Sequence, residues 1–257
     1  MVAHEKRNSG QLFCTVPTRN DLALSSLLFS AQPTQKLGYP FPGSPPLDGS
    51  CRLPYNGAKP PPPSPGEERT YTMKKALIVV DMQNDFITGS LGTKEAEAIL
   101  PKVLEKIRTY RPEQIFVTQD TNPDNYLETN EGLHLPVAHC IAGSQGHALN
   151  PLVAEALEGV PADHFICKPT FGSTLLVEKL KTATGTEVPE IELVGLCTGI
   201  CVLSNAILCK ATFPESDVSV DAACCACVTP QSHDTALSAM KLCQIDINNQ
   251  GSEPWRP

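Results

Sequence analysis

From residue 75 onward, short apolar runs alternate with longer stretches in which apolar residues recur at helical spacing. The apolar runs predict strands at 75–80, 114–119, 163–168, 190–196, 217–223 and 243–247. The stretches between them predict helices at 94–110, 151–159, 173–183, 199–211 and 230–242. Residues 121–150 follow neither pattern, and we expect them to be irregular.

This alternation of strands and helices predicts the fold class. Strands that are apolar on both faces are typical of parallel sheets, which bury both faces under helices. We therefore predict an α/β fold in three layers, with a parallel sheet between two layers of helices.

The first 72 residues differ in kind from the rest of the chain. They hold twelve of the 24 prolines, including the run KPPPPSP at 59–65, and show no sustained period. Such a composition is typical of disordered, polyproline-rich segments. We predict a disordered extension over residues 1–72 and a folded domain over residues 73–250.

The length, charge and composition of the chain narrow the kinds of molecule that we expect it to bind. The chain has 257 residues and a formal net charge of −8, and 41% of its residues are apolar. No apolar run approaches the ~20 residues that a membrane helix needs. The acidic balance and the lack of a Lys/Arg cluster argue against nucleic acid. We expect neither a membrane nor a nucleic acid as a partner.

Eleven cysteines are a high count for such a chain. The length and the lack of a clear secretory signal argue against a small disulfide-stabilised secreted domain. Structural zinc sites use two short Cys/His pairs, and the crowded Cys224, Cys225 and Cys227 do not match that spacing. We expect a cytoplasmic protein in which most cysteines behave as small buried hydrophobic residues.

Polar and reactive side chains follow the predicted strands where each one ends. Asp81 follows the first strand, Asp120 the second and Lys168 ends the third, while Cys201 lies just past the fourth, where a helix begins. Open α/β sheets bind ligands at the carboxyl ends of their strands. The sequence therefore predicts that these side chains converge on one edge of the sheet.

The convergence favours nucleophilic catalysis by Cys201. A helix N-terminus and the ammonium of Lys168 both stabilise a thiolate, whose ordinary pKa is ~8.5. Asp81 is placed to hold the thiol proton and to return it to a leaving amine. Singly, each residue has a commoner structural role, as a turn cap, a solvated lysine or a core cysteine. Cys197 is a poorer nucleophile because it precedes the helix.

Three motifs resemble one known family. IVVDMQNDF, KPTFGS and VGLCTGICV occur in the same order as in isochorismatase-like cysteine hydrolases, the group that includes nicotinamidase and N-carbamoylsarcosine amidohydrolase. The resemblance covers residues 73–247 and implies a six-stranded parallel sheet sandwiched by helices. It also implies a catalytic triad of Asp81, Lys168 and Cys201, and a cis peptide at Leu196–Cys197. The backbone amides of Cys197 and Cys201 would form the oxyanion hole.

The resemblance also implies a divalent metal, because nicotinamidases hold one beside the triad. Asp120 and His139 match two ligand positions, and Glu131, or alternatively Glu128, would add a third. Asn122 stands where those enzymes have a histidine, and an amide oxygen is a weaker ligand for zinc than imidazole. Whether the chain binds Mn²⁺, Mg²⁺ or Zn²⁺, or no metal at all, stays open at this point.

The function implied is cysteine-dependent hydrolysis of a small carboxamide through a thioester, with nicotinamide as the leading substrate. Phe86, close behind Asp81, would pack on a flat substrate ring, or else belongs to the core. One alternative is a metal-independent amidase or carbamoyl hydrolase, which Asn122 favours. Another is a non-catalytic binding module, against which the intact triad argues. We expect the protein to form a homo-oligomer and to bind a small-molecule amide as its substrate.

Overall fold

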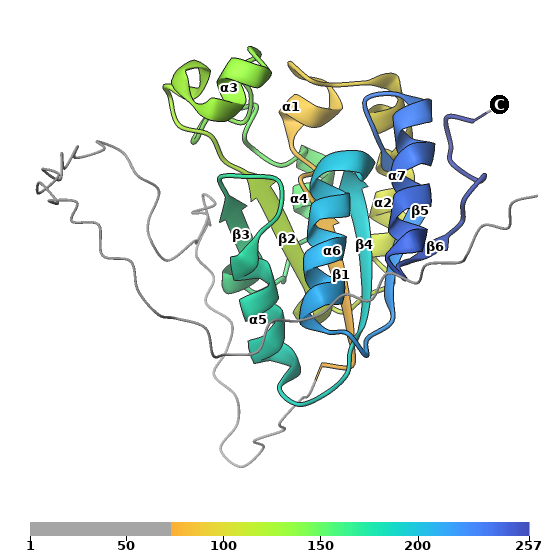
Figure 1. Cartoon of the computed structure of the whole chain (residues 1–257). Helices are drawn as coiled ribbons and strands as arrows, with labels where there is room; N and C mark the ends of the chain where they lie inside the picture. Colours follow the sequence, from red (N-terminus) through yellow and green to blue (C-terminus); the bar gives the residue numbers. More distant parts are fainter. Residues whose placement is uncertain (1–72, 257) are drawn as a thin grey trace, which may run out of the picture. The chain divides into compact units, whose positions relative to one another are not determined.

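The structure is a computed structural model that describes residues 73–256, so the predicted extension over 1–72 lies outside the described residues. Within that range, six strands form one parallel sheet in the order β3-β2-β1-β4-β5-β6 (Figure 1). The strands are β1 (Lys75–Val80), β2 (Ile115–Asp120), β3 (Phe165–Lys168), β4 (Glu190–Leu196), β5 (Val218–Ala226) and β6 (Asp246–Asn248).

Helices connect successive strands. The α-helices are α1 (Asn84–Ile87), α2 (Lys94–Ile107), α3 (Asn130–His134), α4 (Pro151–Ala156), α5 (Thr174–Thr184), α6 (Leu203–Thr212) and α7 (Pro230–Leu242). Short helical turns are η1 (Pro112–Gln114), η2 (Tyr126–Glu128), η3 (Ala162–His164) and η4 (Thr198–Val202), of which η4 is a π-turn. No helix among residues 73–256 is long and apolar enough to cross a membrane.

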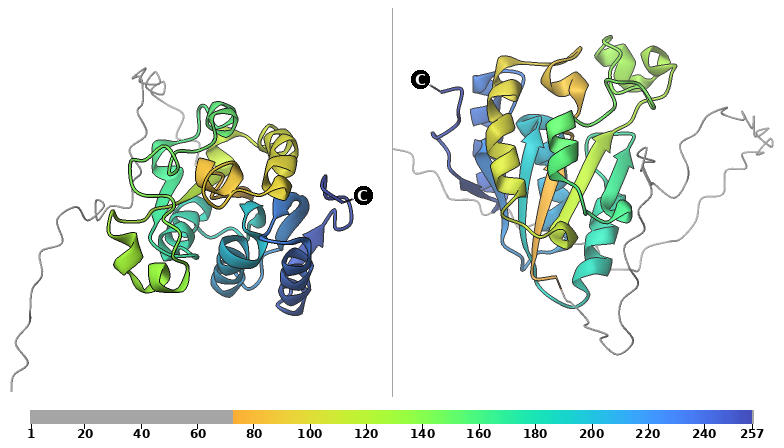
Figure 2. Two further views of the ribbon diagram at one scale, coloured as in Figure 1. Left: turned by 90° about the horizontal axis from the view of Figure 1, so that it is seen from above. Right: turned by 180° about the vertical axis from the view of Figure 1, so that it is seen from behind.

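The sheet is covered on both faces. Helices α5, α6 and α7 lie on one face, and α2 and α4 on the other (Figure 2). Successive strand residues point to opposite faces. Ile78 and Val80 therefore pack in the core under α5–α7, whereas Leu77 and Val79 pack in the core under α2 and α4. These two cores confirm the predicted three-layer α/β fold.

Local sequence signals explain where several helices begin. The hydroxyl oxygen of Thr93 accepts a hydrogen bond from the backbone N–H of Ala96 and caps α2. Ser173 caps α5 in the same way through Leu176. Pro230 opens α7 after the capping residue Thr229, since proline at the first helical position loses no helical hydrogen bond.

Most predicted elements agree with the structure, and two regions differ. β1, β4 and α7 have the predicted bounds, and the other predicted strands and helices occur with shifted ends. The expectation of an irregular segment at 121–150 is wrong in part, because η2 and α3 lie there. The short helix α1 was not predicted either. Both α1 and α3 lie above the carboxyl edge of the sheet (Figure 1).

The cysteines largely follow the expectation of buried hydrophobic residues. Six free cysteines of the described part are buried, namely Cys140, Cys201, Cys209, Cys224, Cys225 and Cys227. Cys197 is half-buried and Cys243 is exposed. The core, rather than a reactive role, therefore accounts for most of these thiols.

Candidate active site

The carboxyl ends of β1, β2 and β3 bring three charged side chains together. Asp81 follows β1 directly, and its backbone adopts the left-handed conformation, with φ 50°. Asp120 and Lys168 end β2 and β3 and are direct neighbours in the sheet register. Because β2 lies between β1 and β3, the parallel topology alone makes these residues neighbours.

The fourth chemical group comes from the turn after β4. Cys201 lies in the π-turn η4, which leads into α6. The peptide bond Leu196–Cys197 is cis, which confirms the expectation drawn from the family resemblance. The carbonyl oxygen of Cys197 accepts hydrogen bonds from the backbone N–H groups of Ile200 (3.0 Å) and Val202 (3.2 Å). These bonds fold residues 197–202 into a tight turn that presents Cys201.

Asn205, which the sequence did not single out, ties this turn to the loop after β3. Its side chain is fully buried in α6. The amide nitrogen donates to the carbonyl oxygens of Cys201 (2.8 Å) and Phe171 (3.1 Å), and the amide oxygen accepts from the backbone N–H of Ser173 (2.9 Å). The amide thereby couples the position of Cys201 to the loop that follows Lys168.

Lys168 is the centre of the charged group. Its Nζ lies 2.6 Å from Oδ2 of Asp81 and 3.4 Å from both Sγ of Cys201 and Oδ1 of Asp120. The hydroxyl of Thr118 donates to the other carboxylate oxygen of Asp81 (2.6 Å). Both Asp81 and Lys168 are almost completely buried. An acid, an ammonium and a thiol therefore meet at one edge of the sheet, as the sequence predicted, and the structure adds that they are buried there.

Burial and charge shift the pKa values of these groups. Burial raises the pKa of Asp81 above its ordinary value, and the charge of Asp120 adds to this rise while Lys168 opposes it. Burial also raises the pKa of Cys201, and Lys168 again opposes the rise. Burial alone would lower the pKa of Lys168, but the neighbouring anionic groups raise it. The resting pair is therefore a neutral thiol beside a charged ammonium.

A second cluster lies beside this one. The side chains of Asp120, Glu131 and His139 each offer one ligand atom, and these atoms all lie within 4.8 Å of one another. Nε2 of His139 is 3.4 Å from Asp120 and 3.8 Å from Glu131. Nδ1 faces the carbonyl oxygen of Val137 at 2.8 Å, and must carry the proton because a carbonyl only accepts. In the neutral ring, Nε2 then directs its lone pair between two carboxylates.

This donor set fits a divalent cation. An imidazole lone pair facing two carboxylates is unfavourable unless a proton or a metal ion lies between them. Glu131, not Glu128, completes the set, since Glu128 is exposed and accepts a hydrogen bond from Asn125. Glu131, the third ligand that the family resemblance implies, thus lies beside His139, and its role as a ligand stays a prediction.

The side chain of Asn122 does not point an oxygen at the cluster. Its amide nitrogen donates to Oδ2 of Asp120 (3.4 Å) and to the carbonyl oxygen of His139 (3.1 Å). Two acceptors fix the orientation of the amide, so that its nitrogen faces the carboxylate. Asn122 therefore orients two residues of the cluster instead of adding an oxygen to it.

A cavity of about 180 Å³ opens onto both clusters. Cys201, Cys197, Asp120, Glu131 and His139 line it together with mainly apolar side chains. The apolar lining includes Phe86, Leu91, Leu135, Phe171, Leu196, Ile200 and Val228. Apart from Thr93, the lining of the cavity is therefore apolar except where the cysteine thiols, the two carboxylates and the imidazole lie.

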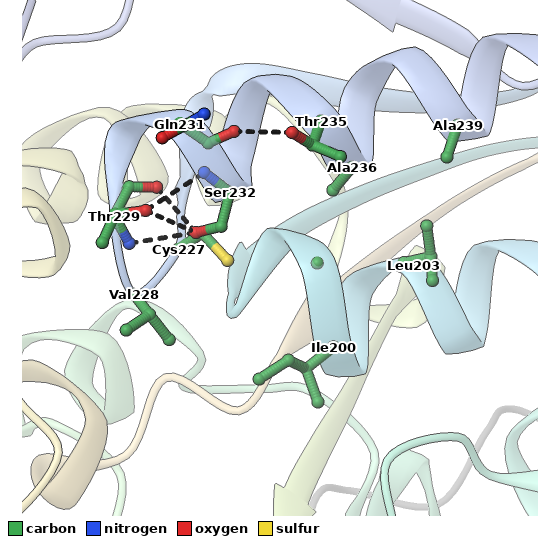
Figure 3. A pocket seen from close by; sticks show the side chains of 11 residues that line it. Ile200, Leu203, Cys227, Val228, Thr229, Gln231, Ser232, Thr235, Ala236 and Ala239 are labelled. Atoms are coloured by element: carbon green, nitrogen blue, oxygen red, sulfur yellow. Dashed lines mark hydrogen bonds between the residues drawn. The ribbon is translucent and has the colours of Figure 1, made fainter.

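A larger groove runs beside this cavity, between η4–α6 and α7 (Figure 3). Its volume is about 550 Å³, and it shares Ile200, Cys227 and Val228 with the smaller cavity. Figure 3 shows the side chains of Ile200 and Leu203 on one wall and those of Thr235 and Ala239 on the other. None of the clustered charged residues lines the groove, so the smaller cavity is the one that the reactive and charged side chains border.

Comparison with known proteins agrees with this arrangement. The family model for the isochorismatase domain matches residues 75–249. The chain belongs to the isochorismatase family. It is therefore an isochorismatase-like hydrolase, and the sheet edge described above is the candidate active site of this hydrolase. No curated protein sequence matches the chain.

Solved structures of this isochorismatase family are similar along nearly their whole length. A pyrazinamidase from Pyrococcus horikoshii in complex with zinc is 27% identical, with a TM-score of 0.56 over 68% of this chain and 98% of that one. A nicotinamidase from Bacillus subtilis is 26% identical, with a TM-score of 0.58 over 68% and 99%. An N-carbamoylsarcosine amidase from Thermoplasma acidophilum shares the fold at 21% identity, with a TM-score of 0.55 over 72% and 99%.

The structure brings every predicted site residue of this hydrolase to one place. Asp81, Lys168 and Cys201 are in contact, and Asp120, Glu131 and His139 form the adjoining cluster. Phe86 lines the cavity, with its ring centroid 5.6 Å from that of His139. The catalytic, oxyanion-hole, substrate and metal roles of these residues stay predictions. The role of Asn205 could not be predicted because two of its three partners, Phe171 and Ser173, lie more than 30 residues away along the chain.

Proposed function

We propose that this hydrolase cleaves a small carboxamide by nucleophilic attack of Cys201, and that nicotinamide, converted to nicotinate and ammonia, is the leading substrate. The proposal rests on one contact: Sγ of Cys201 lies 3.4 Å from Nζ of Lys168. The same ammonium is paired with Asp81. A thiol needs this kind of acid–base help to act as a nucleophile. The identity of about 26% to a nicotinamidase supports the choice of substrate.

The first half-reaction transfers the acyl group to sulfur. Asp81 takes the proton of Cys201, and Sγ attacks the carbonyl carbon while the carbonyl electrons move to oxygen. The raised pKa of Asp81 makes its carboxylate a stronger base than an ordinary one. The backbone amides of Cys197 and Cys201 stabilise the oxyanion. Collapse of the intermediate breaks the C–N bond, Asp81 protonates the amine, and ammonia leaves a thioester.

The second half-reaction reverses these roles with water. Asp81 takes a proton from water, and the oxygen attacks the thioester carbonyl. The C–S bond breaks, the proton returns to sulfur, and the carboxylic acid leaves. Lys168 keeps its charge throughout, because the surrounding anionic groups raise its pKa. Its ammonium thus offsets the negative charge that moves between Asp81 and Cys201.

The cavity suits a compact substrate. Its volume of about 180 Å³ is below the roughly 300–1,000 Å³ of pockets for drug-sized ligands. The ring of Phe86 on the cavity wall offers an apolar face to a flat ring. A single-ring carboxamide meets both conditions.

Asp120, Glu131 and His139 would hold the divalent metal ion. One histidine and two carboxylates form a borderline-to-hard donor set, which suits Mn²⁺ or Mg²⁺ as well as Zn²⁺. A metal ion bound there would act as a Lewis acid and orient a substrate atom. Asn122 adds no imidazole to this set, and its amide nitrogen, which faces Asp120, adds no oxygen ligand either.

Asn122 also supports a second candidate, a metal-independent amidase or carbamoyl hydrolase of the same fold. With only one imidazole, the metal affinity would be modest, and the thiol, its base and the oxyanion hole can act on a carboxamide without a metal. The two candidates share the role of Cys201 and differ in substrate and in metal dependence.

One assay separates them. Ammonia release is measured for nicotinamide, pyrazinamide, N-carbamoylsarcosine and ureido compounds, with chelated and with metal-loaded protein. The leading proposal expects nicotinamide hydrolysis that chelation removes. Full activity of chelated protein on a carbamoyl compound would support the second candidate. Cys201→Ala is the control, and turnover by that variant would refute both.

A further inference from the structure

Thr198 is a buried residue of the nucleophile turn that the proposed reaction does not use. It lies three residues before Cys201 and directly after Cys197, and its side chain is completely buried. Its hydroxyl lies 2.8 Å from Nδ1 of His233, which is also completely buried, in the first turns of α7. A hydrogen bond 35 residues apart in sequence thus joins the turn to a neighbouring helix (the start of α7 is visible in Figure 3).

The proton positions in this contact follow from a third buried residue. Nε2 of His233 lies 3.3 Å from Oε1 of Glu253. Hydrogen bonds from Arg256 and from backbone N–H groups hold the pKa of Glu253 below its ordinary value, although burial opposes them, so its carboxylate only accepts. Nε2 must therefore carry a proton. Burial lowers the pKa of His233, so the ring is neutral and Nδ1 accepts from Thr198.

Glu253 is itself held in place by the segment after β6. The guanidinium of Arg256 pairs with both Glu253 and Asp234. The backbone N–H of Gly251 also donates to Glu253 (2.9 Å). The indole of Trp255 packs edge-on against His233, with ring centroids 5.2 Å apart at 90°. The orientation of His233 is therefore determined on three sides: by Thr198, by Glu253 and by Trp255.

Although His233, Asp234 and Glu253 offer three close ligand atoms, the guanidinium of Arg256 already pairs with both carboxylates. The cluster therefore does not act as a cation site. The hydroxyl of Thr198 links it to the turn that holds Cys201. The two members nearest the reacting groups, the hydroxyl of Thr198 and the imidazole of His233, are neutral, so this chain fixes geometry and brings no charge next to the nucleophile turn.

We propose that His233 is a positioning residue, which holds the nucleophile turn through Thr198 and is itself oriented by Glu253. The inference rests on the proposed role of Cys201. The turn is then fixed at two points: Asn205 holds the carbonyl of Cys201 from the side of α5, and His233 holds Thr198 from the side of α7. Loss of the second point lets Sγ and the amide of Cys197 move relative to each other. A displacement of about 1 Å in such a geometry reduces rates by up to ~100-fold.

The test uses substitutions that keep the shape of the turn. Thr198→Val removes only the hydroxyl, and Thr198→Ser restores it. The rate of Cys201 alkylation by iodoacetamide is followed by peptide mapping, together with kcat, KM and Tm. We expect Thr198→Val and His233→Asn to slow alkylation and to lower kcat by about tenfold or more, with little change in KM. Thr198→Ser recovers most of both rates.

His164→Asn is the matched control. His164 donates to the carbonyl oxygen of Ile115 (2.9 Å) and stacks on Phe116, far from Cys201 in the sheet. This variant should lower Tm without slowing alkylation of Cys201. If Thr198→Val behaves like the control, the positioning role is refuted. If the wild type hydrolyses no amide but Thr198→Val still slows alkylation, the positioning role stands and the proposed reaction fails.

Discussion

The ammonium of Lys168 and the carboxylate of Asp81 form an ion pair at 2.6 Å that solvent does not reach. Removing a charged side chain from water costs several kcal/mol. A buried ammonium or carboxylate is therefore tolerated only beside a partner of opposite charge. The pair therefore links the stability of the fold to the integrity of the reacting groups.

Lys168→Met should remove turnover and destabilise the protein together. The variant leaves Asp81 and Asp120 buried without their cation, which costs about 3–5 kcal/mol. Urea unfolding measures the loss. Lys75→Met is the matched control, because Lys75 pairs with Glu190 at 3.6 Å on the exposed surface, where such a pair contributes about 1 kcal/mol or less. Equal losses in the two variants would show that the buried pair is not coupled to stability.

The pH profile of kcat/KM should report the raised pKa of Asp81. Burial raises this pKa above the ordinary 3.8, so protonation removes the base at a higher pH than for an exposed carboxyl. Activity should therefore fall as the pH decreases through the raised value, and hold above it. Initial rates at low substrate concentration measure this limb. An acid limb at the ordinary carboxyl pKa would contradict the assignment of Asp81 as the base.

Metal content should depend on Glu131 and not on Glu128. Glu131→Gln removes a charged donor next to His139 and should weaken binding of Mn²⁺ or Zn²⁺, whereas Glu128→Gln changes an exposed side chain outside the cluster. Asn122→His should tighten binding, since imidazole is the stronger donor. Titration calorimetry with each metal ion measures the affinities. Identical affinities in all three variants would remove the cluster from consideration as a metal site.

Gly195→Ala should destabilise the fold strongly. A Cβ at this position would lie 2.1 Å from the carbonyl oxygen of Val80, and the φ of +118° also excludes most side chains. We expect a loss above about 4 kcal/mol, in the range of severe steric substitutions. Gly143→Ala is the control, because it has φ +77° but open space around the Cβ, and should cost about 1 kcal/mol. A tolerated Gly195→Ala would mean that β1 and β4 can separate.

Parts of the architecture that depend on local pattern were predictable from the sequence. β1 is apolar after Lys75, β4 is mainly apolar and interrupted only by Glu192 after its first residue, and α7 carries a capping threonine and a proline at its start. The meeting of Asp81, Lys168 and Cys201 followed from one topological rule, that parallel strands end at the same edge. For these residues, a position at the end of a strand, or in the turn that follows one, was sufficient information.

Other parts depend on contacts that no local pattern records. The segment 121–150 folds around polar contacts to distant residues, such as the backbone N–H of Cys140 donating to Asp85. The bond between Thr198 and His233 joins residues 35 apart, and neither belongs to a recognisable pair in the sequence. β6 has only three residues at the edge of the sheet, half-buried or exposed, so its apolar signal was weak and its start was placed too early.

Several residues of the cavity wall and the ion pair behind Cys201 come from different kinds of segment. Phe86, Leu135 and Phe171 lie on short connecting stretches, whereas Asp81 and Lys168 lie at the ends of buried strands. Connecting segments accept replacement and insertion far more readily than strands in a core. Substrate specificity can therefore change through these connecting stretches during evolution, while Asp81 and Lys168 are kept. The same stretches are the place to introduce sequence diversity when a new specificity is engineered.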